Sequence, residues 1–347
     1  MQRIALIGFG TVGQGLAEIF LQKENELKKK HGYEWQIVAV ADPIKGSVSC
    51  REGLDIPQLL HLAKENTSLT SYVCSKGCDS CEKGWDAVET IKNSNADVIC
   101  ELAYTDLSTG EPAITHCKTA FCSGKHIVTS NKGPAALAYR EMKKLADDNN
   151  VQFRIEGTVM SGTPILNLVE GPLAGNTIHS VKGIMNGTTN YILSQMEDGM
   201  TYSDALQKAQ ELGYAEADPT GDVEGYDARA KVTILANVVM GESLNISDVS
   251  CKGITEISQD DIAKAKEQNA RWKLIGCVEN IDGKINAYVR PELIPMSHPL
   301  AGIMGATNAV TFNTDLMGDV TIVGAGAGRI ETGFSILTDL LKIHKTT

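Results

Sequence analysis

The segment at residues 4–13, IALIGFGTVG, restricts the possible folds more than any other part of the chain. Its apolar start predicts a buried strand, which runs directly into Gly8, Gly10 and Gly13 at the spacing G-x-G-x-x-G. In this setting the first glycine permits a tight turn, the second lets backbone approach a pyrophosphate, and the third lets the next helix pack closely. Backbone N–H groups at the start of that helix can bind phosphates. The segment therefore predicts a dinucleotide-binding fold.

Strand and helix patterns alternate along residues 1–155. Strand patterns cover residues 35–42, 96–103, 126–130 and 151–157, and helical patterns cover residues 111–123 and 134–148. This alternation is typical of an α/β fold with a Rossmann-type, doubly wound parallel sheet. Residues 320–347 again join a strand, glycines and a helix, so we expect this C-terminal segment to return to the dinucleotide-binding domain, residues 1–155.

A different pattern begins after residue 155. Glycine-rich turns separate longer helical patterns at residues 201–212 and 225–240, and late strand patterns lie around Ala287 and Val310. We expect residues 156–319 to form a second, α+β domain that binds the substrate and makes a dimer.

Composition excludes several classes of function. The net charge of −11 opposes binding to nucleic acid, whose phosphates are also negative. No stretch approaches the roughly 20 apolar residues of a membrane span, and the first residues predict a strand rather than a signal peptide. Nine cysteines in a chain of 347 residues indicate free thiols in a reducing compartment. We expect a cytoplasmic protein.

The choice of nicotinamide cofactor depends on the end of the second strand. Asp42 can accept hydrogen bonds from the adenosine ribose and would repel a 2′-phosphate, which favours NAD. Lys45 and Arg51 follow closely, and either cation could neutralise that phosphate, so NADP stays open. Alternatively, Asp42 is only a turn residue before Pro43.

Four polar segments resemble homoserine dehydrogenase: TSNKGPAA at residues 129–136, NGTTNYIL at 186–193, ELGYAEADPTGDVEGYDARAK at 211–231 and GAGAG at 324–328. The resemblance covers nearly the whole chain and matches the short form that lacks a C-terminal regulatory module. It implies reversible, NAD- or NADP-dependent oxidation of L-homoserine to L-aspartate 4-semialdehyde in threonine and methionine biosynthesis. It also implies a homodimer.

Oxidation of a primary alcohol removes a hydride and a proton, and the developing alkoxide needs a cationic or acidic neighbour. By resemblance, Lys231 moves the proton, Lys132 contacts substrate and cofactor, and Asp222 and Asp227 line the same pocket. Sequence spacing alone leaves another interpretation, in which Asp227 and Lys231 form an ordinary surface pair one helical turn apart.

The resemblance also implies the substrate contacts. Glu216 binds the substrate amino group, and Gly187 and Thr188 hold the substrate carboxylate where a helix begins. The alternatives are an exposed loop carboxylate at Glu216 and an ordinary helix cap at residues 186–190.

Cofactor contacts follow from the glycine motif and from the resemblance. Thr105 would border the nicotinamide, although the family usually has Thr-Pro where this chain has Ala103 and Tyr104. The expected cofactor-binding residues are Gly8, Phe9, Gly10, Thr11, Val12, Gly13, Asp42, Lys45, Thr105, Lys132 and Gly328. Gly328 could instead be a simple turn at the start of a helix.

The segment EGTVMSGTP, residues 156–164, resembles the family loop that holds a monovalent cation through main-chain oxygens. The oxygens would come from Glu156, Val159, Ser161 and Thr163. Hard oxygen ligands exclude a soft metal, so we expect sodium.

Cys74, Cys78 and Cys81 form the array C-x3-C-x2-C in the connection that follows the second strand. An iron–sulfur cluster is disfavoured, because the alternation of elements does not match a radical enzyme. A zinc site lacks an evident fourth ligand, since Cys50 and His61 are near only in sequence. We expect a loop of free or redox-sensitive thiols, outside the catalytic site.

Two other functions remain as alternatives. Another nicotinamide-dependent amino-acid or hydroxy-acid dehydrogenase would keep the glycine motif but should lack the carboxylate and lysine series of residues 211–231. A non-catalytic nucleotide- or redox-sensing protein would be favoured by loss of Lys132, Lys231 or Glu216, and all three are present.

Overall fold

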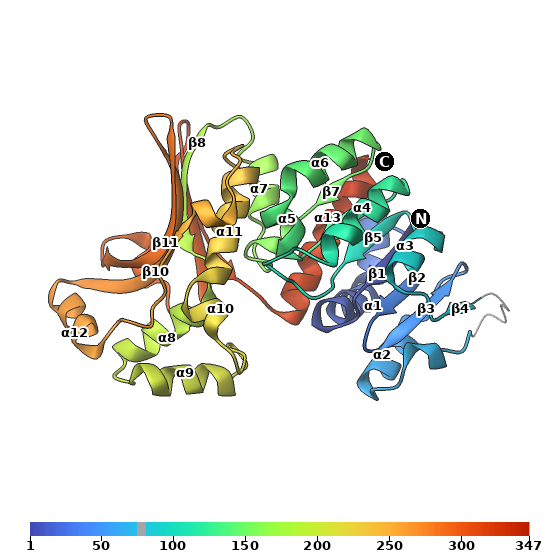
Figure 1. The fold of residues 1–347 in the computed structure, drawn as a ribbon, viewed down its shortest axis with the longest axis horizontal. Coiled ribbons are helices and arrows are strands. Elements are labelled where there is room, and N and C mark those ends of the chain that lie inside the picture. Colours follow the sequence, from blue (N-terminus) through green and yellow to red (C-terminus); the bar gives the residue numbers. More distant parts are fainter. Residues whose placement is uncertain (75–80, 347) are drawn as a thin grey trace. The chain divides into compact units, whose positions relative to one another are not determined.

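The computed structural model describes residues 1–74 and 81–346. The chain forms two compact units. Unit 1 comprises Met1–Gly162 together with Gly328–Thr347, and unit 2 comprises Thr163–Ala327. The ribbon is drawn in Figure 1.

Unit 1 is built on a seven-stranded sheet with the order β4-β3-β2-β1-β5-β6-β7. Its strands are β1 (Gln2–Ile7), β2 (Trp35–Asp42), β3 (Gly46–Cys50), β4 (Cys81–Lys83), β5 (Val98–Glu101), β6 (His126–Thr129) and β7 (Phe153–Arg154). The five strands from β2 to β7 in this order pair in parallel, whereas β3 and β4 extend the sheet as antiparallel strands. The expected Rossmann-type parallel sheet is confirmed.

Helices cover this sheet and connect its strands. They are α1 (Thr11–His31), α2 (Ile56–Lys64), α3 (Ala87–Asn93), α4 (Ala113–Cys122), α5 (Lys132–Leu137), α6 (Tyr139–Asp148) and α13 (Arg329–Thr346), with the short 3-10 helices η1 (Leu69–Ser71) and η2 (Glu156–Thr158). Figure 1 shows the red α13 among the blue and green elements of unit 1. The C-terminal helix therefore belongs to the same unit as the first strand.

α13 packs tightly on α1. A Cβ atom at Gly15 would lie 2.1 Å from the Arg329 carbonyl oxygen, and one at Gly333 would lie 2.8 Å from the Leu16 backbone nitrogen. Glycine at both positions lets the two helix backbones approach. Arg329 also forms an ion pair with Glu18 at 2.7 Å.

Two local expectations are wrong. The helix expected over residues 134–148 is two helices, α5 and α6, because Ala138 between them has φ −141° and ψ 21°, outside helical geometry. The strand expected over residues 151–157 is confined to β7, since the chain turns into η2. α3 begins at Ala87, where Asp86 provides a capping box.

Unit 2 contains a six-stranded sheet with the order β13-β12-β8-β10-β11-β9. The strands are β8 (Ile178–Ile184), β9 (Ser250–Cys251), β10 (Ala270–Ile281), β11 (Lys284–Pro295), β12 (Thr307–Thr314) and β13 (Gly318–Ala325). The helices are α7 (Leu166–Glu170), α8 (Gly187–Glu197), α9 (Tyr202–Glu211), α10 (Thr220–Val223), α11 (Tyr226–Val238) and α12 (Gln259–Glu267), with η3 (Ile246–Asp248) and η4 (Pro299–Gly302). α11 packs close to the sheet, because Gly276 leaves room for Val232.

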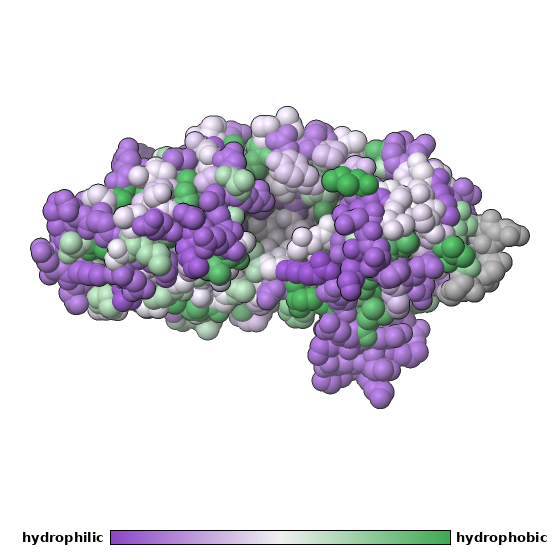
Figure 2. Space-filling model, turned by 90° about the horizontal axis from the view of Figure 1, so that it is seen from below, coloured by the Kyte–Doolittle hydropathy of each residue, from purple (hydrophilic) through white to green (hydrophobic). Residues whose placement is uncertain are grey.

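One face of the molecule is largely polar. Figure 2 shows a mostly hydrophilic face on which apolar residues form separate small patches. Within residues 1–74 and 81–346, no helix has the length and apolar character needed to cross a membrane.

Candidate active site

The glycine loop of unit 1 is shaped by close backbone contacts. Gly8 has φ +102°, and a Cβ there would lie 2.4 Å from the Leu102 carbonyl oxygen. A Cβ at Gly13 would lie 2.6 Å from the Gly8 carbonyl oxygen, whereas one at Gly10 would meet no atom within 4 Å. Gly8 and Gly13 thus set the turn, and Gly10 borders open space, as a loop that admits a pyrophosphate requires.

Asp42 joins this loop to the end of β2. Its Oδ2 accepts a hydrogen bond from the Phe9 N–H at 2.8 Å, and its Oδ1 accepts from the N–H groups of Ile44 and Lys45, each at 2.9 Å. Burial alone would raise the pKa of Asp42, but these three donors and the Lys45 charge hold it below its ordinary value. Asp42 is therefore an ionised group that forms the turn and also fixes the glycine loop.

Asn131 connects the loops that follow β5 and β6. Its amide donates to the carbonyl oxygens of Ala103 at 3.3 Å and Tyr104 at 3.0 Å, and its Oδ1 accepts from the Gly133 N–H at 2.9 Å. Half-buried Thr105 follows in the first loop, and Lys132 is the first residue of α5. Carboxyl ends of parallel strands are where this fold binds ligands, so both expected contacts lie at a suitable edge.

A buried carboxylate supports the same edge, and the sequence interpretation missed it. Glu101 ends β5 with a fully buried side chain, and its Oε1 lies 3.2 Å from His116 Nδ1. The Thr129 hydroxyl donates to the Glu101 carbonyl oxygen at 2.7 Å. The Glu101 Oε1 also accepts from the Ala103 N–H at 3.3 Å. The only sequence signal was a charged residue inside an apolar strand pattern.

In unit 2, Lys231 lies at the centre of a polar cluster on α11. Its Nζ donates to Asp227 Oδ2 and to the Met185 carbonyl oxygen, each at 2.7 Å. The Lys231 side chain is only 10% exposed and that of Asp227 is 21% exposed. A solvent-exposed surface pair is therefore excluded.

Asn186 links the two aspartates of this cluster. It caps α8 through its Oδ1, which accepts from the Thr189 N–H at 2.9 Å. Its amide donates to Asp222 Oδ1 at 2.6 Å and to Asp227 Oδ2 at 3.0 Å. Burial, and next the charge of Asp227, raise the pKa of Asp222 above its ordinary value, against the opposing Asn186 hydrogen bond and Lys231 charge. The structure thus brings both aspartates and the lysine together.

The expected carboxylate-binding residues lie at the start of α8. Gly187 is its first residue, and a Cβ there would lie 2.6 Å from the Ala306 carbonyl oxygen, which accounts for glycine at this position. The buried Thr188 donates from its hydroxyl to the Tyr214 carbonyl oxygen at 2.6 Å. Glu216, by contrast, is an exposed residue of the connection between α9 and α10, and its carbonyl oxygen accepts from Gln210.

Asn308 was not singled out from the sequence. It is fully buried, and within residues 1–74 and 81–346 neither its amide nitrogen nor its oxygen has a hydrogen-bond partner. A Cβ at Gly187 would lie 3.1 Å from its Oδ1, and one at Gly326 would lie 2.4 Å from its Nδ2. An unsatisfied buried amide is costly, so this group beside the start of α8 is suited to a polar ligand.

Lys273 and Asn190 hold the loop that precedes β12. The Asn190 amide donates to the carbonyl oxygens of Ile303, Gly305 and Thr307, and its Oδ1 accepts from Lys273 Nζ at 2.9 Å. Burial lowers the pKa of Lys273 to about 8. The backbone against which Gly187 packs is thereby fixed.

The segment expected to bind a cation is buried and locally strained. Met160 has φ 48°, which side chains rarely adopt, and it is fully buried. The Ser161 hydroxyl donates to the Gly157 carbonyl oxygen at 2.9 Å, and the Thr163 hydroxyl donates to the Ala325 carbonyl oxygen at 3.0 Å. Glu156 is also buried, and its N–H donates to Asp339 at 2.9 Å.

Gly328 precedes α13 with φ +146°, a conformation suited to glycine. A Cβ at this position would meet the carboxylate of Glu331 at 2.1 Å. Gly328 therefore forms the entry to α13, and its contact with the cofactor stays a prediction.

The cysteines depart from the sequence expectation. Cys50 and Cys81 lie on paired strands, not on a connecting loop, and Cys50 is close to Cys74 and Cys81 in space. The expectation that Cys50 is near only in sequence is wrong, because the antiparallel pairing of β3 with β4 places Cys50 opposite Cys81. Cys78 lies outside the described residues. Burial and a hydrogen bond with Cys50 raise the pKa of Cys81 to about 11, so its thiol is not a nucleophile near neutral pH.

Comparison with known proteins gives a consistent result. The family model described as Homoserine dehydrogenase matches residues 164–341. The chain is 47% identical to the NAD(+)-dependent homoserine dehydrogenase of Pseudomonas canavaninivorans, with 99% of this chain and 96% of the relative covered. A crystal structure from Archaeoglobus fulgidus assigned to the homoserine dehydrogenases has a TM-score of 0.87 at 38% identity and 99% coverage of both chains. A hyperthermophilic archaeal homoserine dehydrogenase mutant in complex with NADPH has a TM-score of 0.83 at 30% identity, covering 100% of this chain and 98% of that chain.

Proposed function

The chain belongs to the homoserine dehydrogenase family, and from this premise we propose how its residues divide the reaction. It is a nicotinamide-dependent oxidoreductase that acts on the CH–OH group of L-homoserine and forms L-aspartate 4-semialdehyde reversibly. This reaction belongs to the biosynthesis of threonine and methionine. The observation that carries the assignment of roles is the buried cluster of Lys231, Asp227, Asn186 and Asp222.

Lys231 is the proton carrier of this proposal. An ammonium has three N–H donors, and two of them bind Asp227 and the Met185 carbonyl oxygen. The third is then available for the substrate oxygen. In the oxidation, Lys231 enters as the neutral amine and accepts the hydroxyl proton; in the reduction, it enters as the ammonium and returns that proton to the aldehyde oxygen. Asp227 orients the ammonium, and Asn186 holds Asp227 in place.

Residues of unit 1 hold the cofactor. The loop from Gly8 to Gly13 and the N-terminus of α1 bind the pyrophosphate, and Asp42 binds the adenosine ribose. Thr105, Lys132 and Gly328 make the remaining contacts. The bound nicotinamide supplies the hydride acceptor and donor.

NAD is the preferred cofactor in this proposal. Asp42 is ionised and fixed by Phe9, so it favours ribose hydroxyls over a 2′-phosphate. The Pseudomonas canavaninivorans relative is likewise named NAD(+)-dependent. Lys45 supports NADP as a second cofactor, and a related archaeal structure contains NADPH.

Substrate specificity is assigned to unit 2. The first N–H groups of α8, at Gly187 and Thr188, bind the substrate carboxylate. Glu216 binds the amino group, and its exposure leaves its carboxylate accessible. Lys132 contributes a further contact to the substrate.

We also propose a sodium ion held by the main-chain oxygens of Glu156, Val159, Ser161 and Thr163. Support comes from the buried, strained backbone at Met160. The test compares thermal stability and rate in sodium chloride with those in tetramethylammonium chloride at equal ionic strength. Equal values in the two salts would exclude a sodium requirement.

A cytoplasmic homodimer completes the proposal, with unit 2 as the contact. Thr321 and Val323 of β13 pair with Thr311 and Ala309. They lie on the sheet face opposite α11, which packs on the face of Gly276. Val323 is 50% exposed there. Light scattering coupled to gel filtration tests the dimer, and a monomer at micromolar concentration would contradict it.

The activity is tested by the initial rate of absorbance increase at the nicotinamide band, with L-homoserine and either NAD or NADP. We expect a saturable, homoserine-dependent rate that is faster with NAD. The assignment would be contradicted if L-homoserine were oxidised with neither NAD nor NADP and the reverse reaction with aspartate semialdehyde also failed.

A further inference from the structure

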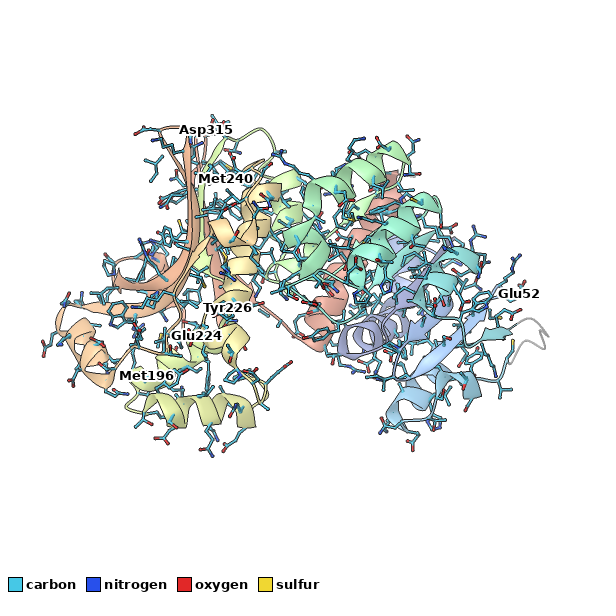
Figure 3. All side chains as sticks on the ribbon, in the orientation of Figure 1. Glu52, Met196, Glu224, Tyr226, Met240 and Asp315 are labelled. Atoms are coloured by element: carbon cyan, nitrogen blue, oxygen red, sulfur yellow. The ribbon has the colours of Figure 1, made fainter. Side chains whose placement is uncertain are left out.

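Three cysteine side chains of unit 1 converge at the antiparallel edge of the sheet. The sulfur atoms of Cys50, Cys74 and Cys81 all lie within 4.8 Å of one another. Cys50 is the last residue of β3 and Cys81 the first of β4, and the two pair directly in the antiparallel register. Cys74 approaches from the segment that follows η1. Glu52, labelled in Figure 3, lies just beyond Cys50 at this end of β3.

The backbone around the cluster is fixed by polar contacts that involve Tyr72. The Asp55 N–H donates to the Tyr72 hydroxyl at 2.7 Å, and Lys83 Nζ donates to the Tyr72 carbonyl oxygen at 2.8 Å. Tyr72 is two residues from Cys74, and Lys83 is two residues from Cys81. These bonds hold both cysteine-bearing segments against each other. Cys50 is fully buried, and Cys74 and Cys81 pack against the apolar core.

The cluster has the chemistry of a soft-metal site. Thiolates select zinc, copper(I) or iron over magnesium and calcium, and a tetrahedral geometry favours zinc. Zn–S distances of about 2.3 Å place ligand sulfurs about 3.8 Å apart in a tetrahedron. Because every pair of these sulfurs lies within 4.8 Å, a contraction of at most about 1 Å would close the site.

We propose that Cys50, Cys74 and Cys81 bind one Zn²⁺ ion as thiolates, with water or another side chain as fourth ligand. Each thiol releases its proton to solvent as its sulfur binds the ion. Cys74 is disulfide-bonded, so the reduced chain is the form that binds. A phosphine reductant supplies the two electrons and becomes the phosphine oxide by taking oxygen from water.

The role of the ion is structural. β3 begins at Gly46, directly after the turn formed by Asp42, and the Leu69 N–H donates to the Lys45 carbonyl oxygen at 2.7 Å. A bound zinc ion would cross-link β3, β4 and the segment after η1. The site therefore braces the turn that carries the ribose-binding carboxylate, without taking part in hydride transfer.

The test uses the full chain purified with a phosphine reductant, and metal content is measured by mass spectrometry. We expect one zinc per chain, lost on chelation and restored by added Zn²⁺. Cys81→Ser should lose the ion. Cys122→Ser is the matched control, since Cys122 is an exposed cysteine of α4, and it should keep the ion.

A second measurement uses the wild-type chain, so its result does not depend on whether the variants fold. Cobalt(II) added to the reduced, metal-free wild-type chain should give the absorption of a thiolate-bound tetrahedral ion, and the thermal midpoint should rise. Absence of both signals would overturn the proposal. So would zinc retained at wild-type stoichiometry in Cys81→Ser and in the double variant Cys50→Ser and Cys81→Ser.

Discussion

Lys231 and Asp227 form a hydrogen-bonded ion pair of 2.7 Å on successive turns of α11, with the lysine side chain only 10% exposed. The same separation in sequence occurs in ordinary surface pairs, which contribute a few tenths of a kcal/mol. Burial and the further contact with Asn186 distinguish this pair. A charged pair removed from solvent in this way needs a functional or structural reason, because desolvation offsets the gain in attraction.

Replacement of Lys231 by alanine should reduce turnover by at least about a hundredfold, the lower range for loss of a general acid or base. Affinity for NAD should not change, because the proposed cofactor contacts lie in unit 1. Steady-state rates and a separate binding titration with NAD give the two quantities. Turnover within a few-fold of wild type would remove Lys231 from the proton transfer.

Asp222→Asn should raise stability and lower activity. Its folded pKa is raised, chiefly by burial and then by the charge of Asp227. Between the unfolded pKa and the higher folded pKa, the folded state binds more protons than the unfolded state. The free energy of unfolding therefore falls as pH rises through this range, and the loss is complete above the folded pKa. The asparagine removes this cost, and we expect a gain of about 0.5–2 kcal/mol near neutral pH.

Urea unfolding from pH 4 to pH 8 checks this sign for Asp222→Asn. The advantage of the variant should grow with pH and then level off. An advantage that is independent of pH would contradict the titration as its cause, and unchanged kcat would show that the carboxylate has no catalytic role.

Asp42→Asn and Lys45→Gln should shift cofactor use in opposite directions. Loss of the carboxylate charge removes repulsion of a 2′-phosphate, so the ratio of kcat/KM for NADP to that for NAD should rise by about tenfold. Loss of the Lys45 cation should lower the same ratio. Lys30→Gln, on the exposed end of α1, serves as the control. If Asp42→Asn and Lys45→Gln changed the ratio of kcat/KM for NADP to that for NAD in the same direction, the assignment would be contradicted.

Lys273 should make stability rise with pH above about pH 8. Burial lowers its folded pKa from 10.5 to about 8. The charge of Glu197 opposes this shift, and the charge of Arg271 adds to it. Between these values the unfolded chain keeps the proton and the folded chain does not, so the unfolded state binds more protons and stability rises with pH.

Comparison with Lys273→Met isolates this effect. The difference in unfolding free energy between wild type and variant should grow by up to about 1.4 kcal/mol per pH unit in that range. Chemical unfolding at about pH 8 and about pH 10 measures it. A constant difference would show that the amine titrates outside this range.

The parts of the fold that could be predicted have strong local signals. The end of β2 at Asp42 and the glycine loop follow from apolar runs that stop at glycine or a carboxylate. β3 and β4 were missed because GSVSC and CEK are short and weakly apolar, so their pairing depends on β2 rather than on their own pattern. The break at Ala138 has no proline or glycine to mark it.

The candidate site likewise contains residues that could be predicted from the sequence and residues that could not. Lys231, Asp222 and Thr188 were expected from a segment pattern, whereas Asn186 was considered only as part of a helix cap and Asn308 was not assigned any role. Amide side chains serve as caps, turns and ligands, so sequence cannot distinguish these uses. Only the contacts in the structure show that Asn186 bridges two carboxylates.

The packing of α13 on α1 has a consequence for synthesis on the ribosome. Leu16 and Phe20 of α1 share a core with Ile336 and Leu340 of α13. The intervening residues, Thr163–Ala327, form a unit of their own. Domains generally fold as units when their chain has emerged, so the inserted unit can complete its core first. The chain of unit 1 begins with β1, but its core is complete only when α13 has left the ribosomal exit tunnel.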